Sequence, residues 1–265
     1  VGMATEIPPH NLNEVVTALI YLIEHPEATT LDLMQFIKGP DFPTGACLLG
    51  TQGIYEAYST GRGSVPVRSV IDVEEGEKGQ RTRLVVKEIP YQLNKTKLIE
   101  QIAELVQNGR IEGIADLRDE SDRTGMRIAI ELKRDAFPEV VLNNLYKYTR
   151  LQSNYAFNMV ALVNNRPRLL TLKEIMVEFL KHRIEVIRRR TQFYLNGCRR
   201  REHLVTGYLL ILDNLDDVIA LIRGSESAKF AEIALRERFQ LSEEQATAIL
   251  ELQLRRLTCL EKQKL

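Results

Sequence analysis

The segment of the sequence best suited to chemistry is Thr60-Gly61-Arg62-Gly63-Ser64. Glycine has no Cβ, so Gly61 and Gly63 would let the backbone approach a phosphate closely, and the Arg62 guanidinium offers a fork of N–H donors. With only two glycines, the segment is neither a dinucleotide fingerprint nor a Walker loop. A glycine-rich hairpin turn with a solvated arginine explains the same residues, and the spacing alone favours that turn.

A cluster of carboxylates precedes a predicted strand, and carboxylates at this density can hold a divalent metal. Arginines alternate with them, so a salt-bridged turn is the better interpretation. The acidic residues are Asp116, Asp119, Glu120 and Asp122, and the arginines are Arg118, Arg123 and Arg127.

No other pattern specifies an active site. Pro8-Pro9-His10 reads as a stiff entry into a helix capped by Asn11. Tyrosine can act as a nucleophile, but no tyrosine stands beside a histidine in the sequence, and neither HExxH nor GxSxG occurs. The arginine triplets 188–190 and 199–201 are typical of the solvated or ion-paired face of a long helix.

Composition narrows the class of protein. The 265 residues carry 36 basic and 36 acidic side chains, so DNA contact would need a local patch. The three cysteines, Cys47, Cys198 and Cys259, are far apart and indicate reduced thiols in a cytosolic protein. No apolar run approaches the roughly 20 residues of a membrane span. The chain starts without Met and stops within a helical pattern, so we expect an excised piece of a longer protein.

The elements that must position these residues form an α+β region. Asn11 and Glu14 open a predicted helix over 11–24, and the alternation of Met126–Leu132 predicts a half-buried strand. Further helices are expected at 31–37, 96–108 and 135–148, and further strands at 46–49, 65–73 and 83–89.

A single long helix is predicted from Thr171, capped with Glu174, to Gly224, because apolar residues recur every three or four positions and no proline intervenes. Its apolar stripe requires a partner, either a returning helix or another chain. Ser242 and Gln245 cap a last helix, which with residues 226–239 predicts a small helical knob.

A series of ordered motifs then identifies a resemblance that spans essentially the whole chain: the sequence resembles the A subunits of bacterial type IIA DNA topoisomerases, most closely those of DNA gyrase. The motifs are Val1–Thr5, Ile7–Asn11, Gly39–Thr44, Thr60–Gly63, Glu88–Gln92 with Asn94-Lys95, Leu117–Asp122, Asn143–Tyr146, Asn158–Leu162, Gln245-Ala246 with Ile249-Leu250, Leu254–Thr258 and Leu260-Glu261.

The resemblance implies a fold and two domains. Residues 1–165 would form the α+β tower (shoulder) domain. Residues 166–265 would form the descending helix of a coiled-coil arm and part of the globule that dimerises at the exit gate.

The resemblance also implies a mechanism. In this family a tyrosine between an arginine and a threonine attacks a DNA phosphodiester in each strand, and the two breaks open a gate for a second duplex. No Arg-Tyr-Thr occurs here, so this piece alone should not cleave DNA and has no catalytic residue. Mg²⁺ and ATP would be used through the gyrase B protein, with no cofactor or metal held by this piece. The partners would be double-stranded DNA, gyrase B and a second copy of gyrase A, giving a cytoplasmic A2B2 heterotetramer that supercoils DNA.

The resemblance changes the weight of the motifs. Arg62, with Gly61 and Gly63, becomes the expected DNA-phosphate contact, and Lys95 and Lys97 its companions. The stretch Ser242–Leu260 becomes the expected dimer gate. Its contact residues would be Gln245, Ile249, Leu250, Leu254 and Leu257.

Two alternatives stay open at this point. The same subunit of topoisomerase IV shares most of these motifs. The second alternative is a protein of a different functional class, a non-enzymatic coiled-coil interaction protein with an α+β head.

Overall fold

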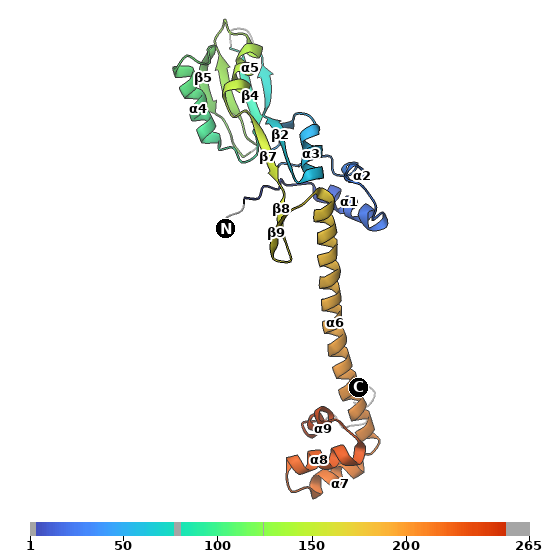
Figure 1. Cartoon of the computed structure of the whole chain (residues 1–265). Helices are drawn as coiled ribbons and strands as arrows, with labels where there is room; N and C mark the ends of the chain where they lie inside the picture. Colours follow the sequence, from blue (N-terminus) through green and yellow to red (C-terminus); the bar gives the residue numbers. More distant parts are fainter. Residues whose placement is uncertain (1–3, 77–80, 124, 253–265) are drawn as a thin grey trace. The chain divides into compact units, whose positions relative to one another are not determined.

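The computed structural model describes residues 4–76, 81–123 and 125–252 of the chain. The chain divides into two compact units, Val1–Lys181 and His182–Leu265 (Figure 1). One helix, α6 (Leu172–Leu212), begins in the first unit and ends in the second. Since Leu172 and Met176 belong to the core of the first unit, that unit extends past the domain limit expected at residue 165.

Helix α1 (Leu12–Glu24) begins as the sequence predicted. The Asn11 side chain accepts hydrogen bonds from the backbone N–H groups of Asn13 and Glu14, which satisfies two of the free donors of the first turn. A reciprocal capping box between Thr29 and Asp32 opens α2 (Thr30–Met34), which is shorter than the helix expected to reach residue 37.

A three-stranded antiparallel sheet lies beside these helices, in the order β1-β2-β7. Its strands are β1 (Cys47–Leu48), β2 (Arg62–Arg68) and β7 (Gln152–Asn158). Helix α3 (Gln52–Thr60) leads directly into β2 (Figure 1). The sequence reading predicted neither α3 nor β7. Together they build the first core, whose fully buried residues include Leu33, Ala57, Tyr58 and Val65.

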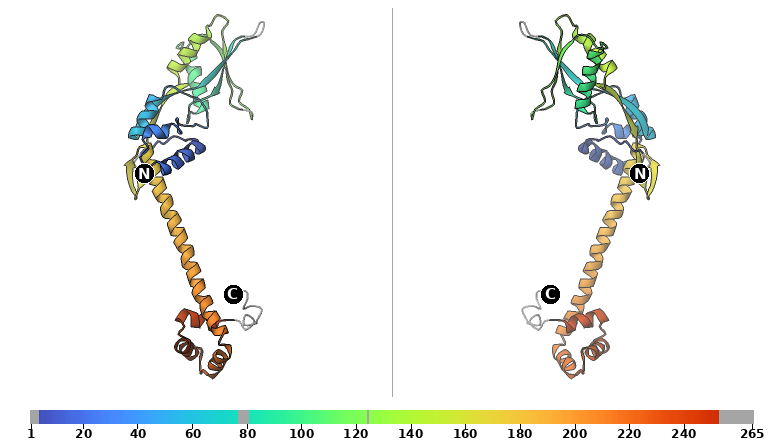
Figure 2. Two further views of the ribbon diagram at one scale, coloured as in Figure 1. Left: turned by 90° about the vertical axis from the view of Figure 1, so that its right-hand side faces the viewer. Right: turned by 90° about the vertical axis from the view of Figure 1, so that its left-hand side faces the viewer.

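A second sheet and two helices form a lobe inserted between β2 and β7. The strand order is β3-β4-β6-β5, all antiparallel. Helices α4 and α5 cover one side of it (Figure 2), and their buried faces meet Leu84, Ile130 and Leu132. The chain enters and leaves the lobe at one point, where the Ser69 N–H donates to Leu151 O at 2.8 Å. The elements are β3 (Val70–Glu74), β4 (Arg83–Glu88), α4 (Lys95–Gln107), β5 (Ile114–Asp119), β6 (Ile128–Leu132) and α5 (Pro138–Tyr148).

One strand prediction in this region was wrong in detail. The single strand expected over 65–73 is two strands in different sheets, since Ser69 separates β2 from β3. Strand β6 is close to the half-buried strand expected: Ile128, Ile130 and Leu132 are fully buried on one face, and Glu131 on the other face is only partly buried.

A two-stranded sheet, β8 (Val160–Val163) with β9 (Arg166–Leu169), completes the first unit. The turn between the strands is Asn164-Asn165, with φ of 51° and 59°. A type I′ turn requires positive φ angles at both central residues, and its twist matches the twist of the two strands of a hairpin. Asparagine adopts such angles readily. The sequence reading did not predict this hairpin.

The second unit contains the end of α6 and three shorter helices. Asn214 interrupts the predicted helix: its side chain donates to Leu210 O at 2.9 Å and the chain restarts as α7, so the helix expected to reach Gly224 was too long. The predicted capping boxes at Thr171 and Ser242 are both confirmed. The shorter helices are α7 (Leu215–Gly224), α8 (Ala228–Phe239) and α9 (Glu243–Leu250), and the core they share includes Ile211, Val218, Leu235, Ala246 and Ile249.

No helix among the described residues is long and apolar enough to cross a membrane. Cys47 and Cys198 are free and exposed, in keeping with reduced thiols, and Cys259 lies outside the described residues.

Candidate nucleic-acid interface

Arg62 stands where a helix becomes a strand. Helix α3 ends at Gly61, which has a φ of 83°, and Arg62 is the first residue of β2, paired with Asn158 of β7. The expected hairpin turn is therefore wrong, because the segment is a helix C-cap followed by a strand. The Arg62 side chain is exposed and makes no hydrogen bond or ion pair with the described part of the chain. Its guanidinium is available to an external anion.

The two glycines beside Arg62 serve internal packing. A Cβ on Gly61 would lie 2.8 Å from Leu170 O, and one on Gly63 would lie 2.6 Å from Gly53 O of α3. These distances are shorter than van der Waals contact, so Gly63 lets β2 approach the backbone of α3, and Gly61 lets the chain pass close to Leu170. The glycines therefore fix where Arg62 stands. Direct phosphate contact by Gly61 and Gly63 stays a prediction.

Lys95 and Lys97 occupy the first turn of α4, behind the N-cap Asn94. Cations at a helix N-terminus are opposed by the helix dipole, and an anion bound there would be favoured. Lys97 is exposed and unpaired within the described residues. Lys95 Nζ lies 2.7 Å from Asp119 Oδ2, and this contact, followed by hydrogen bonds from Ser121, lowers the pKa of Asp119 to about 2. Lys95 could bind DNA only after giving up this partner.

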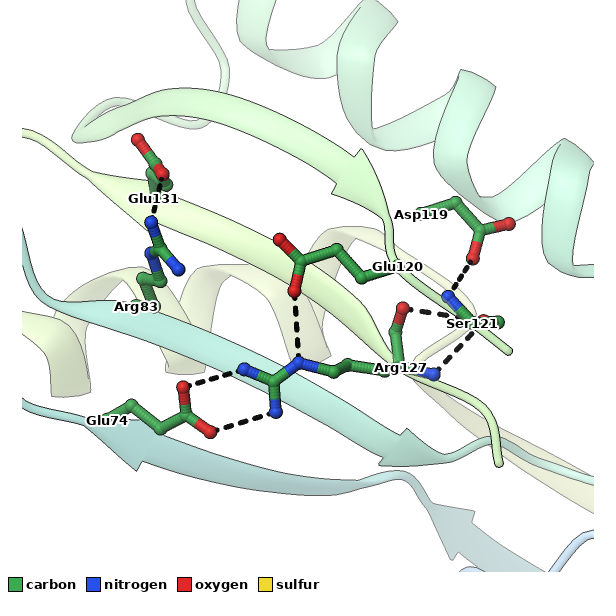
Figure 3. A network of polar contacts seen from close by, with 7 residues as sticks. All are labelled: Glu74, Arg83, Asp119, Glu120, Ser121, Arg127 and Glu131. Atoms are coloured by element: carbon green, nitrogen blue, oxygen red, sulfur yellow. Dashed lines mark hydrogen bonds and ion pairs between the residues drawn. The ribbon is translucent and has the colours of Figure 1, made fainter. Parts of the chain in front are cut away.

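Asp116, Asp119 and Glu120 of the acidic cluster are ion-paired, as the sequence indicated, and Figure 3 shows the contacts around Arg127. Arg127, directly before β6, holds Glu74 through two hydrogen bonds of 2.8 and 3.0 Å and Glu120 through a third of 3.0 Å. Because β4 lies between β6 and β3, the pair Arg127–Glu74 spans a whole strand. The hydrogen bonds from Arg127 lower the pKa of Glu74. Part of the cluster, Asp116 to Asp119, lies in strand β5 and not in a turn.

The face of the sheet opposite α4 and α5 is balanced in charge. The described basic side chains of strands β4 and β5 on this face, and Arg127 beside β6, each have a carboxylate partner, so these residues offer little free positive charge to DNA. No group of three or more His, Cys, Asp or Glu suited to a metal occurs among the described residues. The pairs are Arg83–Glu131 at 2.8 Å, Lys87–Asp72 at 2.5 Å, Arg118–Asp116 at 2.6 Å and Arg127 with Glu74 and Glu120.

His10 meets a tyrosine that lies 48 positions away in the sequence. Its Nδ1 lies 2.8 Å from Pro8 O and its Nε2 lies 2.6 Å from the Tyr58 hydroxyl. Tyr58 is fully buried, and burial raises its pKa, the opposite of an activated nucleophile. The contact fixes the entry into α1, as the structural interpretation of His10 predicts.

The predicted gate residues lie in and around α9. Gln245 and Ile249 are 8% and 6% exposed, so within this chain they stabilise the helical core. The Gln245 side chain donates to His203 O at 2.7 Å and rests against Gly207 of α6. Leu250 is half-buried beside a pocket of about 430 Å³. Leu254 and Leu257 lie outside the described residues. All five residues stay predictions as contacts to a second copy of the chain.

The structure does not unite the predicted DNA contacts in one cluster. Arg62 belongs to the sheet beside the first core, whereas Lys95 and Lys97 belong to the inserted lobe. What Arg62 has beside it is the β8–β9 hairpin: the Met159 N–H donates to Gly61 O and the Leu170 N–H to Met159 O, both at 2.9 Å. Sequence reasoning missed this neighbour. The signal that could have found it was Asn164-Asn165 between two short strand-forming runs.

Comparison with known proteins agrees with the resemblance seen in the sequence. The family model that describes the A subunits of DNA gyrase and topoisomerase IV matches residues 1–265. The chain is 53% identical over 265 residues to the DNA gyrase A protein of Clostridium acetobutylicum and covers 32% of that protein. It is 56% identical over 268 residues to the DNA gyrase A protein of a Synechocystis species and covers 31% of it. A chloroplastic/mitochondrial gyrase A protein of Nicotiana benthamiana is 52% identical over 265 residues, with 28% covered. All of this chain aligns in each case, and it spans about a third of each relative's length.

Proposed function

Since the chain belongs to the family of DNA gyrase and topoisomerase IV A subunits, we propose that it is part of the DNA breakage-and-reunion subunit of a type IIA topoisomerase. In this role it supports binding and bending of the gate DNA segment and contributes to the exit-gate dimer, during ATP-dependent supercoiling. The observation that carries the proposal is the family match over all 265 residues. Gyrase is preferred to topoisomerase IV because the relatives compared above are named as gyrase proteins.

The two units suit two tasks. The first unit, with its α/β lobe and sheet, is the tower that flanks the bent duplex. The second unit, with α6 and the helices α7 to α9, is the coiled-coil arm and the globule of the exit gate. The stretch of α6 over 187–203 is exposed along its length. Its apolar residues, such as Phe193 at 75% exposure, therefore suit contact with a second helix. A coiled-coil interaction protein without enzymatic role has no support in the family match.

The proposed activity requires partner proteins. Two gyrase B proteins and a second copy of gyrase A would assemble with this chain in the cytoplasm. ATP and Mg²⁺ would be held by gyrase B, as the resemblance to this family implies. No Arg-Tyr-Thr segment occurs in the 265 residues. The chain alone should therefore relax no supercoiled plasmid, even with ATP and gyrase B, and relaxation by a nuclease-free preparation would contradict this.

Arg62 is the proposed phosphate contact of the tower. Its support is an exposed guanidinium without a partner in the described part of the chain, held by backbone pairing to β7. Phosphate contacts are independent of DNA sequence and sensitive to salt. Arg62 differs in this from the arginines on the ion-paired face of the lobe, which already have carboxylate partners.

The test is binding of a duplex of roughly 40 base pairs at about 50 and 200 mM salt. Losing one phosphate contact lowers the slope of log affinity against log salt concentration by about 0.9. When the salt concentration rises fourfold, the affinity of Arg62→Ala should therefore fall by a factor about 3.5 times smaller than the factor for the wild type. Arg134→Ala is the matched control, since Arg134 is an exposed arginine of the same unit, unpaired within the described residues. Equal salt slopes for both variants would exclude Arg62 as a contact.

A further inference from the structure

The β8–β9 hairpin, residues 160–169, pairs with no other described strand. The Asn164-Asn165 turn closes it after two residues, so its tip is narrow. Its base is fixed: the Thr5 hydroxyl donates to Val160 O at 2.8 Å, and Gly61 packs against Leu169. The β8–β9 hairpin is therefore a ribbon that starts beside Arg62.

The two faces of the β8–β9 hairpin differ in chemistry. Side chains of a cross-strand pair share a face, and successive pairs alternate. The pairs Val163–Arg166 and Ala161–Arg168 therefore place both arginines on one face. The pairs Leu162–Pro167 and Val160–Leu169 place apolar side chains on the other. Leu162 is 73% exposed and Pro167 is also exposed, so the part of this face near the turn is uncovered in the described part of the chain, whereas Val160 and Leu169 pack at the base.

The β8–β9 hairpin carries positive charge and no negative charge. Residues 160–169 contain two arginines and no Asp or Glu. Arg166 is exposed and has no partner among the described residues. Arg168 is exposed and stands within electrostatic reach of Glu174: the pKa of Glu174 is lowered chiefly by the Thr171 N–H and in smaller part by Arg168. Glu174 is itself committed to capping α6 through its 2.8 Å contact with that N–H.

We propose that the β8–β9 hairpin is a second DNA contact of the tower, in which Arg166 and Arg168 bind backbone phosphates and the apolar pair Leu162–Pro167, the second pair from the Asn164-Asn165 turn, enters the minor groove. The inference rests on the proposed DNA-binding function and extends it from Arg62 along the adjoining ribbon.

Three properties favour duplex DNA as the occupant. A two-stranded ribbon is an established form for entering a DNA groove, and proteins that bend DNA insert apolar side chains, proline included, between base steps. The charge of the β8–β9 hairpin complements phosphate. The adjacent Arg62 gives DNA a continuous path from the sheet to the ribbon. Pro167 also lacks an N–H donor, which discourages pairing of β9 with a strand of another protein.

The experiment uses the 265-residue chain, a duplex of roughly 40 base pairs labelled at both ends, and the two salt concentrations given above. The double variant Arg166→Ala/Arg168→Ala should have a salt slope about 1.8 smaller than the wild type. Between about 50 and 200 mM salt its affinity should therefore fall by a factor about 12 times smaller than the factor for the wild type. Leu162→Ser should leave the salt slope unchanged and reduce the energy transfer between the duplex ends that reports bending. Arg134→Ala is the control, and circular dichroism checks that each variant is folded.

The outcomes separate the two hypotheses. If the wild-type chain binds DNA and Arg62→Ala weakens it, but the hairpin variants match Arg134→Ala, the hairpin inference is wrong and the DNA-binding function stands. If the wild-type chain binds no DNA at either salt concentration, both fail. If Leu162→Ser changes association with gyrase B or with a second copy of the chain and leaves DNA bending unaltered, the β8–β9 hairpin docks a protein and the inference is again wrong.

Discussion

Replacing Gly61 by alanine tests whether this glycine has a structural role beyond its backbone conformation. Two effects act at Gly61. Its φ of 83° is a left-handed conformation, which costs a residue with a Cβ about 1–2 kcal/mol. The added Cβ would also lie 2.8 Å from Leu170 O and 2.9 Å from Leu169 Cγ. Overpacking of this kind costs about 1–3 kcal/mol. We therefore expect Gly61→Ala to lose about 2–5 kcal/mol of unfolding free energy.

Gly109 supplies the matched control. It also follows a helix, α4, and has a φ of 67°, but a Cβ there would meet nothing within 4 Å. Gly109→Ala should therefore lose only the conformational part, about 1–2 kcal/mol. The difference between the two variants isolates the crowding at the base of the β8–β9 hairpin.

Urea unfolding gives the free energies, and hydrogen exchange assigns each loss to a region, since the chain has more than one core. Faster exchange in Gly61→Ala should appear in α3, β2 and the β8–β9 hairpin, while α8 and α9 stay protected. If Gly61→Ala costs no more than Gly109→Ala, the close contact with Leu170 carries no energy and the packing role assigned to Gly61 is refuted.

Other predictions concern titration and charge. Burial lowers the pKa of His10 in the folded chain, whereas an unfolded histidine titrates near about 6.5. As pH falls below that value the unfolded state binds a proton that the folded state does not, so unfolding free energy should fall from pH 7.5 to 5.5, and His10→Gln should flatten this dependence. Tyr58→Phe leaves the partly buried His10 Nε2 without its partner and should cost about 0.5–1.5 kcal/mol in urea unfolding; an unchanged midpoint would contradict the contact. Lys97→Ala should weaken DNA binding more than Lys95→Ala, because Lys95 is already paired, and Lys95→Ala should raise the pKa of Asp119 measured by NMR. A pKa that stays near 2 would show that Lys95 is not its cause.

Local signals predicted the helices that begin with a side-chain cap, and α3, whose N-cap makes no side-chain hydrogen bond, was missed. Capping residues marked the starts of α1, α6 and α9, and their hydrogen bonds are present in the structure. The break after α6 was missed because the apolar spacing continues through Asp213-Asn214 and only a side-chain bond from Asn214 to the backbone marks it. Periodicity is insensitive to such a bond, which is why a helix can be overextended across it.

The strands depended on distant partners. β7 reads Gln-Ser-Asn-Tyr-Ala-Phe-Asn, a polar sequence with weak alternation, and it becomes a strand by pairing with β2. The candidate site had the same limit. The exposure of Arg62 and the contact of its loop with the β8–β9 hairpin depend on residues 159–170, which no spacing rule connects to position 62. Pairing of Lys95 with Asp119 was hidden for the same reason.

The hydrogen bond between Ser69 and Leu151 joins the two ends of the lobe, and this affects the order of folding and the engineering of the chain. The whole lobe leaves and re-enters the sheet across a single 2.8 Å hydrogen bond, so β2 and β7 form an antiparallel pair whose connecting loop is the lobe. A flexible loop of that length would make pairing of β2 with β7 slow, whereas a folded lobe brings the two strands together ready to pair. The lobe should therefore fold first and act as the nucleus of its unit. A short turn joining residue 68 to residue 152 should preserve the sheet, Arg62 and the β8–β9 hairpin while removing the lobe entirely.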